Sequence, residues 1–188
     1  IPFVGAGVSM SLGLPSYASL IRDLGSHVEF DGSIFEQLGD YLTLAEFYNL
    51  RKNGLSELQS HLKEQWKKTE KEVIASPVHR AIVELGCKLI YTTNFDDFLE
   101  KAHKALKTKY RALRSVNDFV NLADDKVHIV KLHGDLRNTK TMVFTESSYF
   151  ERLNFESPLD IKLRADILGK SLLFIGYSLS DINVRLLL

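Results

Sequence analysis

The sequence predicts an α/β fold in which helices flank a parallel sheet and a helical subdomain is inserted after the first strand. Short apolar stretches separated by stretches of helical periodicity are typical of parallel strands that helices cover on both faces. Glycines, carboxylates, a carboxamide and an imidazole follow several of these strands, at the edge where open parallel sheets bind ligands. The helical stretch after the first strand is too long for one crossover helix. We therefore expect residues 1–188 to form a single domain with a Rossmann-like core and a helical insert over about residues 31–75.

The first part of the chain supplies one strand and several helices. The apolar stretch over residues 1–4 predicts a short buried strand, which a glycine turn follows. Apolar residues return at helical spacing over residues 16–28. Residues 31–72 are predicted to be helical throughout, except that Gly54 separates two helices. Two apolar stripes are expected in this stretch, one formed by Leu38, Leu42, Ala45 and Phe47 and the other by Leu55, Leu58, Leu62 and Trp66.

The remainder of the chain alternates between helical and strand patterns. Pro77 is expected to open a helix that Gly86 ends, since proline suits the first helical position and glycine the position just past the helix end. The predicted strands cover residues 88–93, 127–132 and 171–176, with a short edge strand at 110–113, and helices are predicted from Asp96 onward and over 148–153, 160–168 and 181–188.

Charge and cysteine content exclude several classes of function. Basic and acidic residues number 24 each, so no net charge attracts nucleic acid or an anionic membrane to this domain, and only a local basic patch stays open as a binding surface for them. No apolar run reaches the length of a membrane span. The single cysteine, Cys87, cannot form an internal disulfide or a four-cysteine zinc site, and its apolar surroundings predict a buried side chain. We expect a cytoplasmic protein with no bound metal.

The two ends of the chain predict a fragment of a longer polypeptide. The chain begins inside a strand pattern without an initiator methionine, and it closes on an apolar helical edge without a stop signal.

The glycine turn after the first strand is a candidate phosphate site. Gly5 and Gly7 allow a backbone to approach a pyrophosphate, whose charge the amides at the start of the next helix can meet. The dinucleotide pattern needs a third glycine where this chain has Met10, and a tight structural turn explains the two glycines about equally well.

A histidine and two acids provide candidate reactive groups. His133 ends a predicted strand and precedes a glycine, a position where packing seldom requires histidine, and its pKa suits proton transfer near neutral pH. Asp96 and Asp97 follow another strand, although the helix dipole alone favours acids there, most clearly at Asp97. Asn94 also fits a helix cap.

Taken in order, these motifs resemble those of the sirtuin superfamily, and the resemblance spans nearly the whole chain. The matching segments are Gly5-Ala6-Gly7-Val8-Ser9 with Gly13 and Pro15, then Thr93-Asn94-Phe95-Asp96, Lys131-Leu132-His133-Gly134 and Gly176-Tyr177-Ser178.

The residues of these motifs are similar to those of the bacterial sirtuin-like domains found in anti-phage defence proteins, a branch without zinc. Sirtuin deacylases carry a four-cysteine zinc module, which one cysteine cannot build, and an Asp-Phe-Arg segment where this chain has residues 16–18. The resemblance implies an NAD⁺ hydrolase that releases nicotinamide and either ADP-ribose or a cyclic form. An NAD-dependent protein deacylase and a non-catalytic module that senses NAD or ADP-ribose are the alternatives.

The resemblance also implies roles for individual residues and partners. Asp96 would hold the nicotinamide carboxamide, Asn94 would contact the ribose and position water, and His133 would act as general base. A sensor domain or partner protein outside these residues and assembly into homo-oligomers are further implications. The residues implied to contact the rest of NAD are Gly5, Ala6, Gly7 and Ser9 at the phosphates, Gly176 and Ser178 on the adenosine side, and Thr93.

Overall fold

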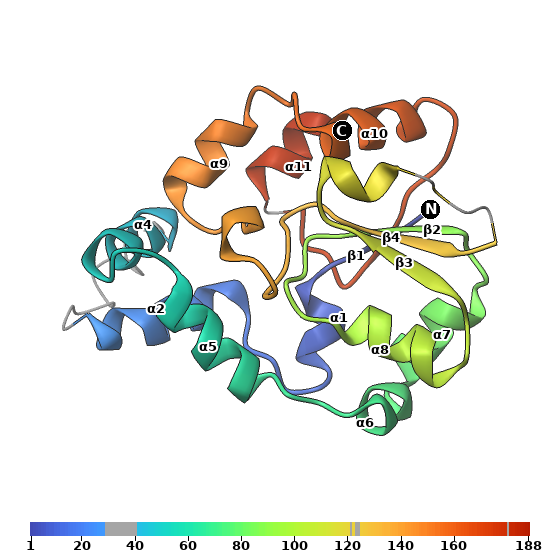
Figure 1. Cartoon of the computed structure of the whole chain (residues 1–188), viewed down its shortest axis with the longest axis horizontal. Helices are drawn as coiled ribbons and strands as arrows, with labels where there is room; N and C mark the ends of the chain where they lie inside the picture. The colour runs from blue at the N-terminus through green and yellow to red at the C-terminus, as the bar shows by residue number, and fades with distance from the viewer. Residues whose placement is uncertain (29–40, 121, 123–124, 180) are drawn as a thin grey trace.

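A parallel sheet forms the centre of the fold (Figure 1). The computed structural model describes residues 1–28, 41–120, 122, 125–179 and 181–188. Within these residues the sheet has five strands in the order β3-β4-β2-β1-β5, and every neighbouring pair is parallel. The predicted α/β class is therefore confirmed, as is the edge position of the strand near residue 110. The strands are β1 (Pro2–Val4), β2 (Leu89–Thr92), β3 (Tyr110–Leu113), β4 (Val127–Lys131) and β5 (Leu173–Ile175).

The strand register brings the predicted motifs to one edge of the sheet. Val4 pairs with Thr92 on one side and with Ile175 on the other, and Thr92 pairs with Lys131. Each of these four residues is the last residue of its strand, β1, β2, β4 or β5. The segments that follow the four strands therefore begin side by side. The Thr92 hydroxyl also donates a hydrogen bond of 2.9 Å to the Val4 carbonyl, which ties the two central strands together.

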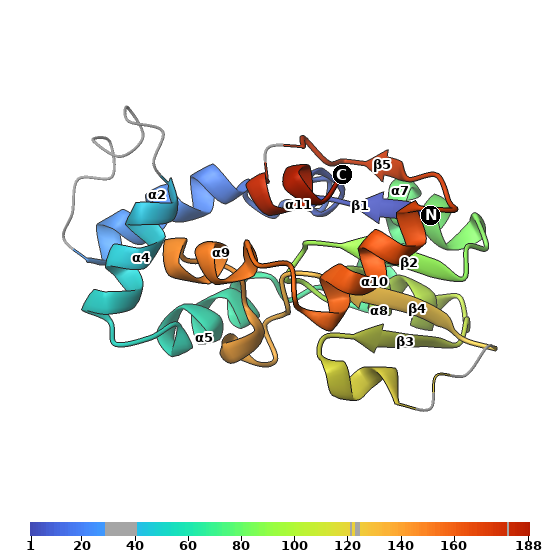
Figure 2. The same ribbon diagram turned by 90° about the horizontal axis from the view of Figure 1, so that it is seen from above.

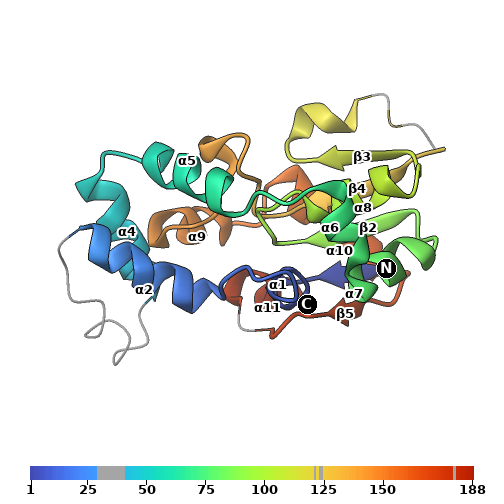
Figure 3. The ribbon, with the colours of Figure 1, turned by 90° about the horizontal axis from the view of Figure 1, so that it is seen from below.

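Helices cover both faces of the sheet (Figure 2). Leu163 of α10 and Val184 of α11 pack on one face, against Phe3 and Tyr91. Helices α1, α7 and α8 pack on the other, and α6 lies beside α7 and α8 (Figure 3). The helices are α1 (Ala6–Met10), α2 (Tyr17–His27), α4 (Tyr41–Arg51), α5 (Ser56–Gln65), α6 (Glu70–Ala75), α7 (Pro77–Glu84), α8 (Phe98–Ala105), α9 (Glu146–Arg152), α10 (Pro158–Ile167) and α11 (Ile182–Leu187), with 3₁₀ turns η1 (Val116–Phe119) and η2 (Thr139–Thr141).

Helices α2, α4 and α5 form a separate apolar cluster, which lies to one side of the sheet together with α9 (Figures 1 and 2). The predicted stripe on α5 is confirmed: Leu55, Leu58 and Leu62 are buried and Trp66 packs against them. Gly54, at φ +126°, separates α4 from α5 as predicted. The boundary expected at about residues 31–75 stays a prediction, because residues 29–40 lie outside the described residues and α6 packs against α7 and α8.

The stripe predicted on α4 is partly wrong. Ala45 is buried, but Leu44 and Tyr48 accompany it, whereas Leu42 is half-buried and Phe47 is 37% exposed. Thr43 and Glu46 of α4 meet the start of α9, where Glu46 accepts hydrogen bonds from Ser147 and Thr43 donates to Glu146. With Thr43 and Glu46 bonded to α9, Leu44 and Tyr48 pack in the apolar cluster. Leu38 lies outside the described residues.

The second of the two helices predicted over residues 31–72 is interrupted. Helix α5 ends at Gln65, and α6 begins at Glu70 after a short connection. Thr69 and Glu72 form a capping box in which each side chain bonds the other residue's backbone N–H, so a new helix starts at this point. Helix α8 likewise begins at Phe98 and not at Asp96, since both Asp96 and Asp97 precede its first turn.

Cys87 is half-exposed, which corrects the expectation of a buried thiol. Cys87 follows Gly86, which has a φ of +66° just past the end of α7, and β2 begins two residues later. In the part of the chain that the structure describes, no helix is long and apolar enough to cross a membrane. Among the same residues, no group of three or more histidine, cysteine, aspartate or glutamate side chains is arranged to hold a metal ion.

His79 on α7 has a buried imidazole that makes the stability of the fold depend on pH. Its Nδ1 lies 2.9 Å from the Ser76 hydroxyl, its ring meets Phe98 edge-on, and its Nε2 has no hydrogen-bond partner among the described residues. Burial lowers the pKa of His79 from 6.5 to about 4. At a pH between these two pKa values, the unfolded chain binds a proton at His79 and the native protein does not. Acidification in this range therefore favours unfolding.

We expect the His79→Gln variant to show a weaker loss of stability on acidification than the wild type. The free energy of unfolding, measured with urea between pH 7 and pH 4.5, should fall less steeply by up to about 1.4 kcal/mol per pH unit. The exposed His61 on α5 provides the control, and His61→Gln should keep the wild-type slope. Equal slopes in His79→Gln and the wild type would contradict the effect assigned to His79.

Candidate active site

A cavity of about 980 Å³ lies between the carboxyl ends of the strands and the helical cluster of α2, α4 and α5. Its volume falls in the range of cavities that bind small molecules and cofactors. The strand side of its wall contains every site residue predicted from the sequence except Gly5: Ala6, Gly7, Ser9, Thr93, Asn94, Asp96, His133, Gly176 and Ser178. The helical side contributes mainly apolar and aromatic residues, among them Leu14, Tyr17, Leu20, Tyr41, Leu42 and Trp66.

Asn94 connects the loop after β2 to the turn after β1. Its side-chain amide donates to the Gly5 carbonyl at 3.1 Å and to the Ser9 hydroxyl at 3.0 Å, and its own N–H donates to Thr92 Oγ1. The alternative that Asn94 is only a helix cap is therefore excluded. Its Oδ1 is buried and has no hydrogen-bond partner among the described residues, which leaves an acceptor available at the cavity wall.

Asp96 and Ser9 form the next part of the wall. The Ser9 hydroxyl donates to Asp96 Oδ2 at 2.7 Å, and the N–H of Phe98 donates to Oδ1 at 3.0 Å. Burial raises the pKa of Asp96, while the Lys131 charge and these hydrogen bonds act in the opposite direction. Each carboxylate oxygen can accept a second hydrogen bond, so Asp96 can still accept from a ligand.

The glycines of the first motif allow two turns to meet. A Cβ atom on Gly5 would lie 2.5 Å from the Gly176 carbonyl oxygen, and one on Gly7 would lie 2.8 Å from the same oxygen. The N–H groups of Gly5 and Gly7 donate to the carbonyls of Ile175 and Gly176. These two amides thus already have partners within the protein, and the glycines serve the close approach of the two turns.

His133 is 3% exposed and lies in the turn after β4. Gly134 has a φ of +72°, and a Cβ atom there would lie 2.1 Å from the Thr141 carbonyl oxygen, so this turn requires glycine. Arg152 donates to the Leu132 carbonyl and pairs with the buried Asp160, which holds the residue before His133 in place. Burial lowers the pKa of His133 to about 4, so the imidazole is neutral near pH 7 and can accept a proton.

The cavity wall also contains residues that the sequence did not predict. Asp181 Oδ2 lies 3.3 Å from His133 Nε2, and the Tyr149 ring packs edge-on against the imidazole. Asp181 closes the Gly-Tyr-Ser-Leu-Ser-Asp segment, so an acid just beyond the last strand was the available signal. Tyr149 and Trp66 lie in ordinary helical patterns, and nothing local in the sequence distinguishes them.

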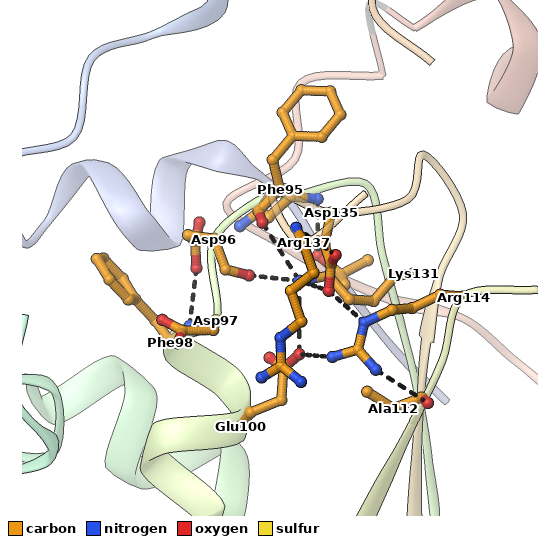
Figure 4. Close-up of polar contacts among 12 residues, drawn as sticks. Phe95, Asp96, Asp97, Phe98, Glu100, Ala112, Arg114, Lys131, Asp135 and Arg137 are labelled. Carbon is orange, nitrogen blue, oxygen red and sulfur yellow. Dashed lines mark hydrogen bonds and ion pairs between the residues drawn. The ribbon is translucent and has the colours of Figure 1, made fainter. Parts of the chain in front are cut away.

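A group of buried charges supports the loop that carries Asn94 and Asp96 (Figure 4). Lys131 is 1% exposed, and its ammonium donates to the Asp96 carbonyl at 2.5 Å. Glu100 and Asp135 lie 3.5 Å and 3.8 Å from the same Nζ, and Arg114 pairs with both acids. The two cations and two anions thus compensate one another beneath the loop.

Comparison with known proteins identifies relatives over the whole chain. The family model described as "SIR2-like domain" matches residues 88–188. A protein of Enterococcus faecium named "NAD(+) hydrolase ThsA" is 29% identical over 99% of this chain, and one of the same name from Bacillus cereus (strain MSX-D12) is 27% identical over 99%. "Defense-associated sirtuin 2" of Bacillus subtilis is 29% identical, also over 99%. The chain spans 38% of the length of each of the first two proteins and 18% of the third.

We expect Lys131→Met to destabilise the protein by about 3–5 kcal/mol, because the loss of one buried cation leaves Glu100 and Asp135 with Arg114 alone. The free energy of unfolding from chemical denaturation provides the measurement. Lys109→Met removes an exposed lysine that pairs with Asp125, and this control should change stability little. A cost for Lys131→Met no larger than that of the control would show that the buried charges do not support the loop.

Proposed function

Because the chain belongs to the family of SIR2-like domains, we propose that residues 1–188 form one catalytic domain that hydrolyses NAD⁺ at the bond between nicotinamide and ribose. The observation that carries this proposal is the position of Asn94 and His133 on the wall of one cavity. The names of the relatives from Enterococcus faecium and Bacillus cereus support the same activity.

The reaction requires few groups from the protein. The bond between ribose C1′ and the pyridinium nitrogen breaks, and its electron pair leaves with nicotinamide, which is neutral. The ribose passes through a state with oxocarbenium character, and water adds to C1′ and releases a proton. The protein must orient the leaving group, direct water to C1′ and accept that proton.

His133 and Asn94 are assigned to the reacting ribose. The neutral imidazole of His133 accepts a proton from water or from a ribose hydroxyl. Asn94 Oδ1, which has no partner among the described residues, accepts a hydrogen bond from the attacking water or the ribose. Since Gly5 and Ser9 hold the Asn94 amide group, its Oδ1 is fixed before substrate binds, which favours reaction.

Asp96 is assigned to the nicotinamide carboxamide, whose N–H₂ group can donate to a carboxylate oxygen of this cavity-lining residue. Gly5 shapes the turn that the phosphates approach, although it does not line the cavity itself. The residues assigned to the rest of the NAD⁺ molecule are Ala6, Gly7 and Ser9 toward the phosphates, Gly176 and Ser178 on the adenosine side, and Thr93.

The biological setting follows from the relatives. Because the matched proteins are more than twice as long as this chain, we infer that sensor or partner modules outside these residues control the hydrolase. The name of the Bacillus subtilis relative supports a role in defence, which we take to be depletion of cytoplasmic NAD⁺ during phage infection, carried out by a homo-oligomer. No metal is assigned to the reaction. Water as acceptor gives ADP-ribose, and a hydroxyl of the same molecule gives a cyclic product.

We expect the full-length protein to release nicotinamide from NAD⁺, and Asn94→Ala and His133→Ala each to lower this rate by about 100-fold or more. Chromatography of the products measures nicotinamide and shows whether the second product is linear or cyclic. His61→Ala removes an exposed histidine and is the matched control, which should retain the wild-type rate. Wild-type turnover in His133→Ala would refute the assignment of the base. NAD⁺ binding without nicotinamide release, even by wild type with its natural activator, would favour a sensing module.

A further inference from the structure

Asp181 is the acidic side chain beside His133 in the cavity. Its Oδ2 lies 3.3 Å from His133 Nε2, and its side chain is 11% exposed. Its other oxygen, Oδ1, accepts a hydrogen bond of 3.1 Å from the N–H of Val184 and caps α11. The start of a helix therefore fixes the orientation of the carboxylate, with one oxygen on the helix and the other toward the imidazole.

Tyr149 of α9 restrains the same carboxylate oxygen. Its hydroxyl donates to Asp181 Oδ2 at 3.2 Å, while its ring lies 5.4 Å from the His133 ring, centroid to centroid, at an interplanar angle of 73°. Burial and the Asp181 charge raise the pKa of Tyr149 well above its usual value, so the phenol keeps its proton and remains a donor. Three segments far apart in the sequence thus converge at the imidazole.

The charges around His133 give Asp181 a specific role. Burial disfavours the imidazolium that forms when His133 takes up a proton, and Arg152 of α9 adds a further positive charge, which Asp160 of α10 partly offsets. Asp181 is the anion whose charge favours the protonated ring. Tyr17 and Tyr177, whose pKa values burial and Asp181 raise, stay neutral and add no charge nearby.

We propose that Asp181, held by Tyr149 and by the start of α11, is a positioning residue for His133: it orients the imidazole and stabilises its charge after proton uptake. This inference rests on the proposed function, in which His133 takes the proton released as water adds to C1′ and nicotinamide leaves. In this step the proton stays on His133, which later releases it to solvent.

The kinetic test compares Asp181→Asn with the wild type in the full-length protein. Asparagine keeps an oxygen for the Val184 N–H but lacks the charge, so the fold and the cap should persist. We expect kcat to fall at least about tenfold with KM for NAD⁺ nearly unchanged, and the acidic limb of the kcat/KM profile to move to lower pH. The pH shift arises because His133 without the anion binds its proton less tightly.

Two variants control for other effects. Tyr149→Phe should lower kcat less than Asp181→Asn, since the carboxylate remains but loses its restraint. Asp125→Asn removes an exposed carboxylate that pairs with Lys109, and it should leave kcat and the pH profile unchanged. A wild-type kcat and pH profile in Asp181→Asn would overturn the proposal. A raised kcat would also overturn it, because Asp181 would then block His133 instead of supporting it.

A direct titration separates this proposal from the proposed function. The pKa of His133 can be followed by NMR of protein carrying ¹³C-labelled histidine, with the His133→Ala spectrum assigning the signal. A lower His133 pKa in Asp181→Asn supports the pair even if the wild type releases no nicotinamide, in which case the proposed function alone fails. An unchanged His133 pKa overturns the proposal whatever the activity.

Discussion

The contact between the Lys131 ammonium and the Asp96 carbonyl supports the strand side of the cavity. A buried ammonium is costly unless opposite charges and acceptors surround it, and here Glu100 and Asp135 supply the charge while the loop supplies the carbonyl. The loop after β2 consequently has a defined position next to these charges (Figure 4). Because Asn94 and Asp96 belong to this loop, the order of the candidate site depends on a charge cluster that does not itself line the cavity.

The two sides of the cavity differ in chemistry. The strand side presents amide, hydroxyl, carboxylate and imidazole groups that hydrogen bonds hold in place, as the contacts of Ser9 with Asn94 and Asp96 illustrate. The helical side presents Tyr17, Tyr41 and Trp66. A wall of fixed polar groups facing an apolar wall orients a ligand and limits water, and the same burial keeps the His133 imidazole neutral.

The glycines of the motifs have a structural explanation that is compatible with a functional one. Gly5 and Gly7 allow the turn after β1 to touch Gly176, and Gly134 allows the His133 turn to pass Thr141. Any larger residue would push these turns apart and move the side chains next to them. The close packing of the backbone therefore sets the positions from which Ser9, His133 and Ser178 reach the cavity wall.

The sequence alone determined the fold class, the strands and most of the candidate wall, because apolar patterns are local and parallel strands bring their carboxyl ends to one edge. Once the strands were located, Asn94 and His133 had to lie near each other. Only the tertiary structure decided which face of α4 is buried, that α5 and α6 are two separate helices, and that Tyr149 and Asp181 reach His133. Those features depend on contacts between residues far apart in the chain, such as the approach of α9 and α11 to the end of β4, and no local pattern encodes such contacts.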